Sequence, residues 1–144
     1  VKGEAVTLAD GRVIQPDAVL GDTIRGSKLV HIGDTSRTDN VVEYVTGDYA
    51  LVIESTFLHE NVEEARSFGH ITAREAATLA LENGVKTLLL THVSRRYRER
   101  DIVDEARRIF PNTYVVRDLD HFALRRDLPV EKKIASYQQS DDAD

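Results

Sequence analysis

The chain has 144 residues, a formal net charge of −6 at pH 7 and no cysteine, and its length fits one domain with a real core. The lack of cysteine excludes disulfides, thiolate zinc ligands and cysteine nucleophiles, so histidine and carboxylate side chains are the candidate metal ligands. The negative charge excludes a generally basic nucleic-acid coat, and no apolar run approaches the ~18 residues needed to span a bilayer.

The first part of the sequence predicts strands joined by short turns. Residues 4–8 and 12–14 flank an Ala-Asp-Gly turn and predict a β-hairpin. Residues 28–32 predict a buried strand, and a second strand is expected over 50–53. A short helix over about 39–45 is expected between the two strands.

The second part contains the clearest helix, over 72–83, where Thr72 can cap the N-terminus with Glu75 three residues on. The other predicted elements are a strand over 86–91, a helix over about 99–110, and strands over 113–116 and 122–124. Strands that alternate with helices predict an α/β layer structure. We expect a domain over 1–128 and a polar, flexible tail over 129–144.

Polar side chains follow each of the three apolar strands. Asp34 follows the first, Glu54 the second and His92 the third, and His70 directly precedes the clearest helix. In layered α/β folds, functional groups gather outside the carboxyl ends of the strands, so these side chains could converge. Two carboxylates and two histidines at one sheet edge suit hydrolytic metal chemistry with proton transfer.

Each of these residues also has a purely structural interpretation. Asp34 could make an Asx-turn, Glu54 could face solvent or cap a loop, and His70 could fix a backbone carbonyl at the helix entry. The basic segment that begins at Arg95 could be a solvated face, because Glu99 and nearby acids blunt its charge. Residue type alone leaves both interpretations open.

The order of the segments favours the functional interpretation. The chain resembles the C-terminal half of the tRNA 3′-processing endonucleases, the ribonuclease Z branch of the metallo-β-lactamase fold, over roughly residues 3–125. The segments that carry the resemblance are Leu-Val-His-Ile-Gly-Asp-Thr at 29–35, Leu-Val-Ile-Glu-Ser-Thr-Phe at 51–57, Gly-His-Ile-Thr-Ala-Arg-Glu-Ala-Ala at 69–77 and Leu-Thr-His-Val-Ser-Arg-Arg-Tyr at 90–97.

The resemblance implies roles for the four polar residues. Asp34 would bridge two zinc ions, and His92 would ligate one of them. His70 would act near the scissile phosphate by stabilising charge or shuttling a proton, and Glu54 would support His70 through a hydrogen bond.

The resemblance also implies contacts with precursor tRNA as the substrate. Arg95, Arg96 and Tyr97 would contact the RNA backbone or 3′ end, because guanidinium groups pair well with phosphate. Thr72, in the Gly-His-Ile-Thr segment, is a further expected RNA contact.

The family's His-x-His-x-Asp-His cluster and its tRNA-gripping arm have no counterpart in this sequence. A zinc site normally needs at least three protein ligands, so we expect the chain alone to be inactive and the remaining ligands to lie outside it. The first residue is Val1 and methionine is absent, which also leads us to expect a piece of a longer protein.

The fold implied is one half of a metallo-β-lactamase αββα sandwich, a mixed sheet with flanking helices. Its inner face would expose apolar strand residues, namely Val30, Leu51, Ile53 and Leu89. A large apolar face favours a partner, so we expect the missing N-terminal half, or a homodimer as is usual in the family.

Three functions stay open at this point. The favoured one is part of a cytoplasmic, zinc-dependent endoribonuclease that removes 3′ trailers from precursor tRNA. The second is another hydrolase of the same fold, acting on a different phosphodiester or ester. The third is a non-catalytic half-domain for dimerisation or RNA binding.

Overall fold

The centre of the molecule is a four-stranded parallel sheet with strand order β3-β4-β5-β6. The computed structural model describes residues 3–22, 24, 26–47, 50–125, 128 and 130–133. The sheet strands are β3 (Leu29–Ile32), β4 (Ala50–Glu54), β5 (Leu88–Thr91) and β6 (Thr113–Val115). Because these strands are parallel, their carboxyl ends meet at the same edge of the sheet.

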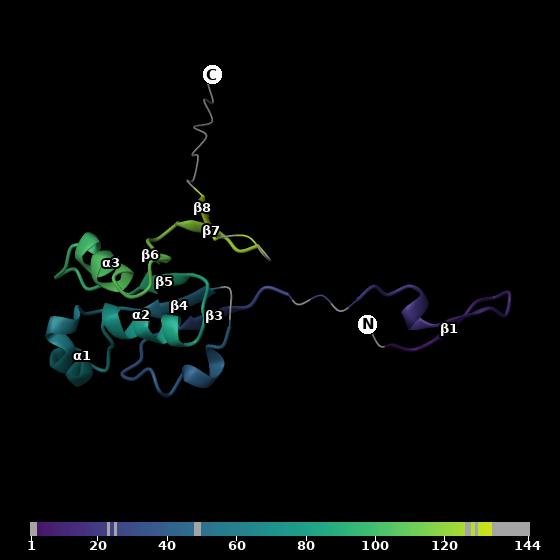
Figure 1. Cartoon of the computed structure of the whole chain (residues 1–144), viewed down its shortest axis with the longest axis horizontal. Coiled ribbons are helices and arrows are strands. Elements are labelled where there is room, and N and C mark those ends of the chain that lie inside the picture. The colour runs from purple at the N-terminus through teal and green to yellow at the C-terminus, as the bar shows by residue number, and fades with distance from the viewer. Residues whose placement is uncertain are drawn as a thin grey trace, which may run out of the picture.

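Helical segments lie between the sheet strands along the chain, and two of the α-helices pack against each other and against the sheet (Figure 1). The α-helices are α1 (Val62–Phe68), α2 (Ala73–Glu82) and α3 (Glu99–Arg107). The short 3₁₀ helices are η1 (Pro16–Ala18), η2 (Val42–Tyr44) and η3 (His59–Asn61). None of the described helices is long and apolar enough to cross a membrane.

Two antiparallel ribbons complete the described chain. Strand β1 (Val6–Thr7) pairs with β2 (Val13–Ile14), which is the predicted hairpin. Strand β7 (His121–Ala123) pairs with β8 (Glu131–Lys133), so three residues of the predicted polar tail form a strand. Residues 134–144 of that tail lie outside the described residues.

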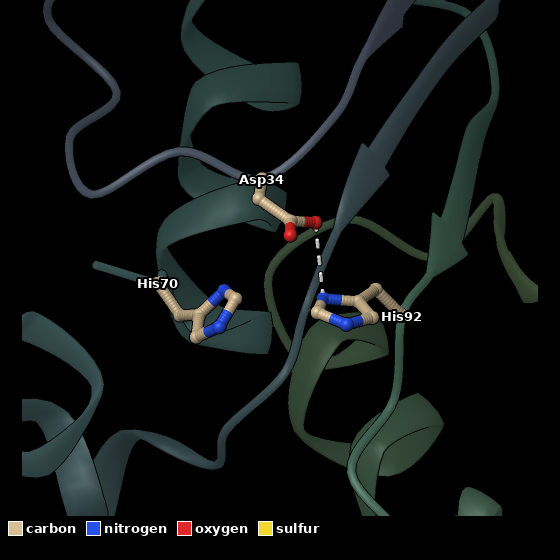
Figure 2. A group of neighbouring side chains, drawn as sticks. All are labelled: Asp34, His70 and His92. Atoms are coloured by element: carbon tan, nitrogen blue, oxygen red, sulfur yellow. Dashed lines mark ion pairs between the residues drawn. The ribbon is translucent and has the colours of Figure 1, made fainter. Parts of the chain in front are cut away.

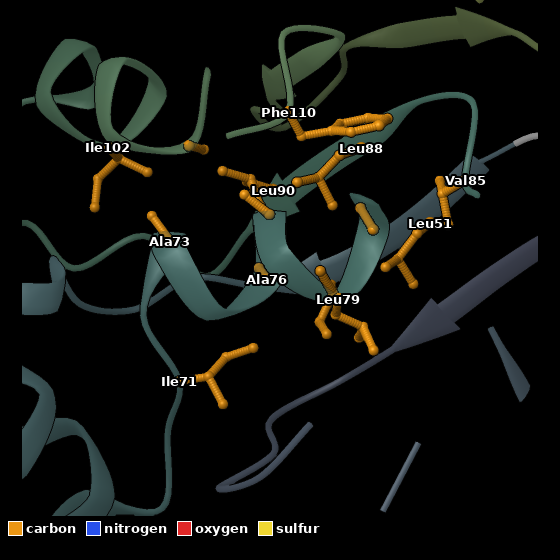
Figure 3. Packing of buried hydrophobic residues seen from close by; sticks show 14 of the residues in the cluster. Leu51, Ile71, Ala73, Ala76, Leu79, Val85, Leu88, Leu90, Ile102 and Phe110 are labelled. Carbon is orange, nitrogen blue, oxygen red and sulfur yellow. The ribbon is translucent and has the colours of Figure 1, made fainter. Parts of the chain in front are cut away.

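The strand register assigns alternate residues to opposite faces of the sheet. Val30 pairs with Leu51, and Leu51 with Leu88, so this row shares the face that packs against α2. Leu89 belongs to the next row and therefore to the opposite face. Figure 3 shows Leu51, Leu88 and Leu90 of the sheet beside Ala76 and Leu79 of α2.

This register corrects the expectation of an exposed apolar inner face. Leu51 and Ile53 are fully buried, and Val30 is half-buried against the same core, because all three face the helices. Leu89 lies on the other face but is also buried. The expected fold class, an α/β sheet with flanking helices, is confirmed; among the described strands β3 to β6 are all parallel, and antiparallel pairing is confined to the ribbons.

The N-terminal hairpin lies apart from the sheet (Figure 1). The residues of the hydrophobic core begin at Val30 along the described chain, so the hairpin contributes none of them. Val6 and Val13 on the hairpin are accordingly more than half exposed.

Candidate metal and catalytic site

The sheet edge brings together Asp34, His70 and His92, as Figure 2 shows. Asp34 follows β3, His92 follows β5, and His70 lies between α1 and α2. One ligand atom from each residue lies within 4.8 Å of the other two. Asp34 Oδ1 is 3.1 Å from His92 Nδ1, and the two imidazole ring centroids are 5.0 Å apart.

Glu54 is the last residue of β4, and its buried carboxylate accepts hydrogen bonds from the polar groups around it. Its Oε1 accepts from the Thr35 backbone N–H at 2.8 Å and from His70 Nδ1 at 2.9 Å. Its Oε2 accepts from the Thr56 hydroxyl at 2.6 Å and from the Thr56 N–H at 3.3 Å. These donors offset the cost of burying a charge. With the His70 Nδ1 proton held by Glu54, the lone pair of His70 is on Nε2.

Thr56 connects the same carboxylate to the second histidine. The Thr56 hydroxyl donates its proton to Glu54, so toward His92 Nδ1, 3.0 Å away, it can only accept. His92 Nδ1 is therefore the protonated nitrogen, which also suits its contact with the Asp34 carboxylate. Both histidines thus carry their lone pair on Nε2. Sequence reasoning missed Thr56, although its position two residues after Glu54 is a usable signal.

The backbone at His92 is held in an unusual conformation. Its φ of +52° lies in the left-handed region, which costs a non-glycine residue on the order of 1 kcal/mol. Hydrogen bonds on both sides of His92 join this segment to the end of β4. The Ser55 N–H donates to the Thr91 carbonyl at 2.9 Å, and the Ser94 N–H donates to the Thr56 carbonyl at 3.3 Å. These bonds turn the His92 side chain toward Asp34.

His70 is positioned by a sharp helix-to-helix turn. Helix α1 ends at Gly69, whose φ of +79° is the left-handed conformation that glycine adopts without a Cβ penalty. The His70 N–H donates to the Ala65 carbonyl at 2.8 Å. The sequence did not predict α1, because its cap residue Asn61 makes no side-chain cap and the helix buries a single residue, Ala65.

Thr72, which was expected to contact RNA, is the buried N-terminal cap residue of α2. The side chain is fully buried and forms the predicted capping box of α2 with Glu75. The hydroxyl donates to Glu75 Oε2 at 2.9 Å and lies 3.2 Å from His59 Nδ1. In this arrangement Thr72 has a structural role, and its contact with RNA stays a prediction.

Three residues after β5 were expected to contact RNA: Arg95, Arg96 and Tyr97. They differ in whether their side chains already have hydrogen-bond partners within the chain. Arg96 donates two hydrogen bonds to Glu64, at 2.6 and 2.7 Å, and this pairing lowers the pKa of the Glu64 carboxyl. The Tyr97 hydroxyl donates to the Asn61 side chain at 2.7 Å. Arg95 is exposed, and within the described part of the chain it has no hydrogen bond or ion pair.

The donor set at the sheet edge fits a divalent cation. A carboxylate oxygen from Asp34 and an imidazole nitrogen from His92 are ligands that zinc accepts, and the Nε2 lone pair leaves His92 ready to bind without losing a proton. Asp34 and His92 are both at least half exposed, so a cation and further ligands could reach them. Glu54 is not available as a ligand, because its oxygens are already occupied by the four donors around it.

Comparisons with known proteins give consistent matches. The chain is 47% identical over 123 residues to the ribonuclease Z of Bradyrhizobium diazoefficiens, and the match covers 85% of the chain and 41% of that protein. Among solved structures, it is similar to a metallo-beta-lactamase fold protein of Bacillus subtilis, with TM-score 0.58, 25% identity and coverage of 63% of the chain and 37% of that protein.

The human short-form tRNase Z has the same fold, with TM-score 0.55, 24% identity and coverage of 78% of the chain and 37% of that protein. The chain spans about two fifths of the length of the curated relative that it matches. No protein-family model matches it. The four-stranded sheet and its helices are thus one part of a metallo-β-lactamase fold.

Proposed function

We propose that this chain, whose sequence corresponds to the C-terminal part of ribonuclease Z proteins, forms part of the active site of a metal-dependent endoribonuclease that removes 3′ trailers from precursor tRNA. The observation that carries this proposal is the convergence of Asp34, Glu54, His70 and His92 at one sheet edge. The substrate class is proposed from the names of the relatives, ribonuclease Z and tRNase Z. The reaction is proposed from the side chains at the sheet edge, which are suited to phosphodiester hydrolysis.

In this proposal Asp34 and His92 hold metal, and the remaining ligands come from outside this chain. Zinc ions held by Asp34 and His92 together with those outside ligands would supply Lewis acidity and an activated water when bound. The left-handed backbone and the Thr56 hydrogen bond keep the His92 ring turned toward Asp34. This chain therefore contributes two oriented members of the ligand set.

His70 is the proposed proton-transfer group. Glu54 holds His70 Nδ1–H, so Nε2 is the atom that can accept a proton from, or return one to, an oxygen of the scissile phosphate. The hydrogen bond from Nδ1–H to Glu54 keeps the His70 ring oriented while Nε2 exchanges a proton. Glu54 does not touch substrate and acts as a positioning residue.

Arg95 and Arg96 are the proposed phosphate contacts, with Tyr97 beside them. Arg95 is free to pair with RNA, whereas Arg96 must first leave the Glu64 carboxylate. We further propose that the missing N-terminal half of the fold is the partner of this chain, that the complete enzyme is a homodimer, and that it works in the cytoplasm.

A complementation assay tests the proposed function. The chain is mixed with a separately produced N-terminal half that carries a His-x-His-x-Asp-His cluster, zinc is added, and 3′-trailer release from a precursor tRNA is followed. Cleavage that needs both halves is the expected result. Asp34→Ala should abolish cleavage, while Asp39→Ala, an exposed carboxylate five residues away that pairs with Arg37, should leave it nearly unchanged.

The proposal fails if a folded, zinc-loaded mixture of the two halves leaves precursor tRNA intact. Cleavage of other phosphodiesters or esters by that mixture would then favour a different hydrolase of the same fold. RNA binding without any hydrolysis would favour a non-catalytic half-domain.

A further inference from the structure

Phe68 presents an exposed aromatic ring next to the candidate site. It is the last residue of α1, two positions before His70, and its side chain is 66% exposed. Helix α1 buries only Ala65, so the helix does not need Phe68 for its own packing. The exposed Phe68 ring, two residues from His70, is therefore accessible to a ligand at the site.

The Phe68 ring continues a row of aromatic rings that leads into the site. It lies parallel to the Phe57 ring, with an interplanar angle of 4° and centroids 6.4 Å apart. The Phe57 ring is 6.2 Å from the His70 ring, and the His70 ring is 5.0 Å from that of His92. Phe57 is buried, which fixes the plane that Phe68 shares.

Guanidinium groups lie near the same row, and two of them are paired with glutamates of α1, Arg96 with Glu64 and Arg66 with Glu63. The Arg96 guanidinium sits over the Phe57 ring, 5.7 Å from its centroid, and Arg95, the preceding residue in the chain, is exposed. Arg66 lies two positions before Phe68 on α1. An exposed aromatic face flanked by guanidinium groups is the arrangement that binds single-stranded nucleic acid, where bases stack and phosphates pair with cations.

We propose that Phe68 is a stacking platform for an unpaired nucleobase of the RNA that flanks the scissile phosphate. This inference rests on the proposed function, since it gives the substrate of the same site a second point of contact. Stacking accepts any base, because every base has a π-face, so Phe68 adds affinity without sequence preference. Phe68 holds the base next to the cleaved bond while His70 transfers a proton at the phosphate.

Fluorescence of 2-aminopurine tests the stacking directly. The full chain is titrated with short single-stranded oligoribonucleotides that carry 2-aminopurine at one position, moved along the strand. Binding should quench the fluorophore at one or two positions. Phe68→Ala should remove that quenching and raise the Kd by about tenfold, whereas Phe68→Tyr and Phe68→Trp should retain both. Leu81→Ala, an exposed apolar residue on α2, is the matched control and should change neither.

Three outcomes overturn the inference. One is RNA binding by Phe68→Ala with unchanged Kd and quenching. Another is full binding by Phe68→Leu, which would show that an apolar surface suffices. The third is loss of association between the two halves of the fold with RNA binding unaffected, which would make Phe68 a protein contact. The first two outcomes leave trailer cleavage in the complementation assay in place, so they are judged separately from the proposed function. The third would lower cleavage there through loss of the partner half, and co-purification of the Phe68→Ala chain with that half distinguishes it from failure of the proposed function.

Discussion

The Glu54 carboxylate reaches two histidines by different routes, directly to His70 and through the Thr56 hydroxyl to His92. The sequence predicts that Asp34, Glu54 and His92 converge, because each follows an apolar strand and parallel strands end at one edge. It does not predict the route through Thr56, since that contact depends on how the ends of β4 and β5 align. The expected contact between Glu54 and His70 is present at 2.9 Å, while the catalytic roles of both residues stay predictions.

Replacing Thr56 by valine keeps the shape of the side chain and removes the hydroxyl. We expect Thr56→Val to weaken metal binding by about 10- to 100-fold, because the His92 ring loses the partner that sets its tautomer and orientation. Thr56→Ser should restore most of the affinity. Calorimetric zinc titration measures the affinity, and ¹⁵N NMR reports which His92 nitrogen is protonated.

Thr78→Val serves as the control for loss of a threonine hydroxyl, since Thr78 bonds only the Arg74 carbonyl on α2. If Thr56→Val lowered stability but left both the tautomer and the zinc affinity unchanged, Thr56 would be structural only.

Arg95 and Arg96 should differ in their effect on RNA binding. Arg95→Ala should weaken binding and reduce the slope of log K against log salt by about 0.7, as expected for one lost phosphate contact to a single strand. Arg96→Ala should have the smaller effect, because its guanidinium is already paired with Glu64. Binding measured by fluorescence anisotropy at several salt concentrations checks this order, and equal losses in slope would contradict it.

At the scale of the elements, the sequence predicted strands β3 to β6 and the two longer helices because their apolar periodicity is strong. It missed α1, which buries one residue, and it gave no sign of β8, whose three residues are all exposed. Local sequence carries little information about such elements, since their stability comes from neighbours in space. The capping box of α2 is the opposite case, because its whole signal lies within four residues.

Substitution of Thr72 tests whether this residue serves to cap α2 or to contact RNA. Thr72→Ala should lower the free energy of unfolding by about 1–2 kcal/mol, since a buried cap and its bond to Glu75 are lost. Thr72→Ser should recover most of the stability. Urea unfolding followed by circular dichroism provides the measurement. A normal stability combined with weak RNA binding would instead support the prediction that Thr72 contacts RNA.

At the scale of the whole molecule, the chain divides into a packed sheet with helices and an N-terminal hairpin that adds nothing to the described core. The sequence predicted the hairpin correctly but could not show its distance from the sheet. That distance depends on packing, and residues such as Val6 and Val13 have no counterpart to pack against among the described residues.

Removal of residues 1–20 should therefore leave the sheet intact. We expect the free energy of unfolding to change by less than about 0.5 kcal/mol, as for surface changes that touch no core contact. Urea unfolding of the shortened chain and of the full chain gives the comparison. A drop of several kcal/mol would mean that the hairpin folds back onto the sheet in solution.

The register of the parallel sheet also has a consequence for folding. The site unites residues from three strands, and the Thr56–His92 contact alone joins positions 36 apart in the chain. Such non-local contacts form only after β3, β4 and β5 have paired, which is a slow step in folding. A cation that binds this edge therefore recognises the paired sheet and not the unfolded chain, and at 100 times its Kd it stabilises the fold by about 2.7 kcal/mol.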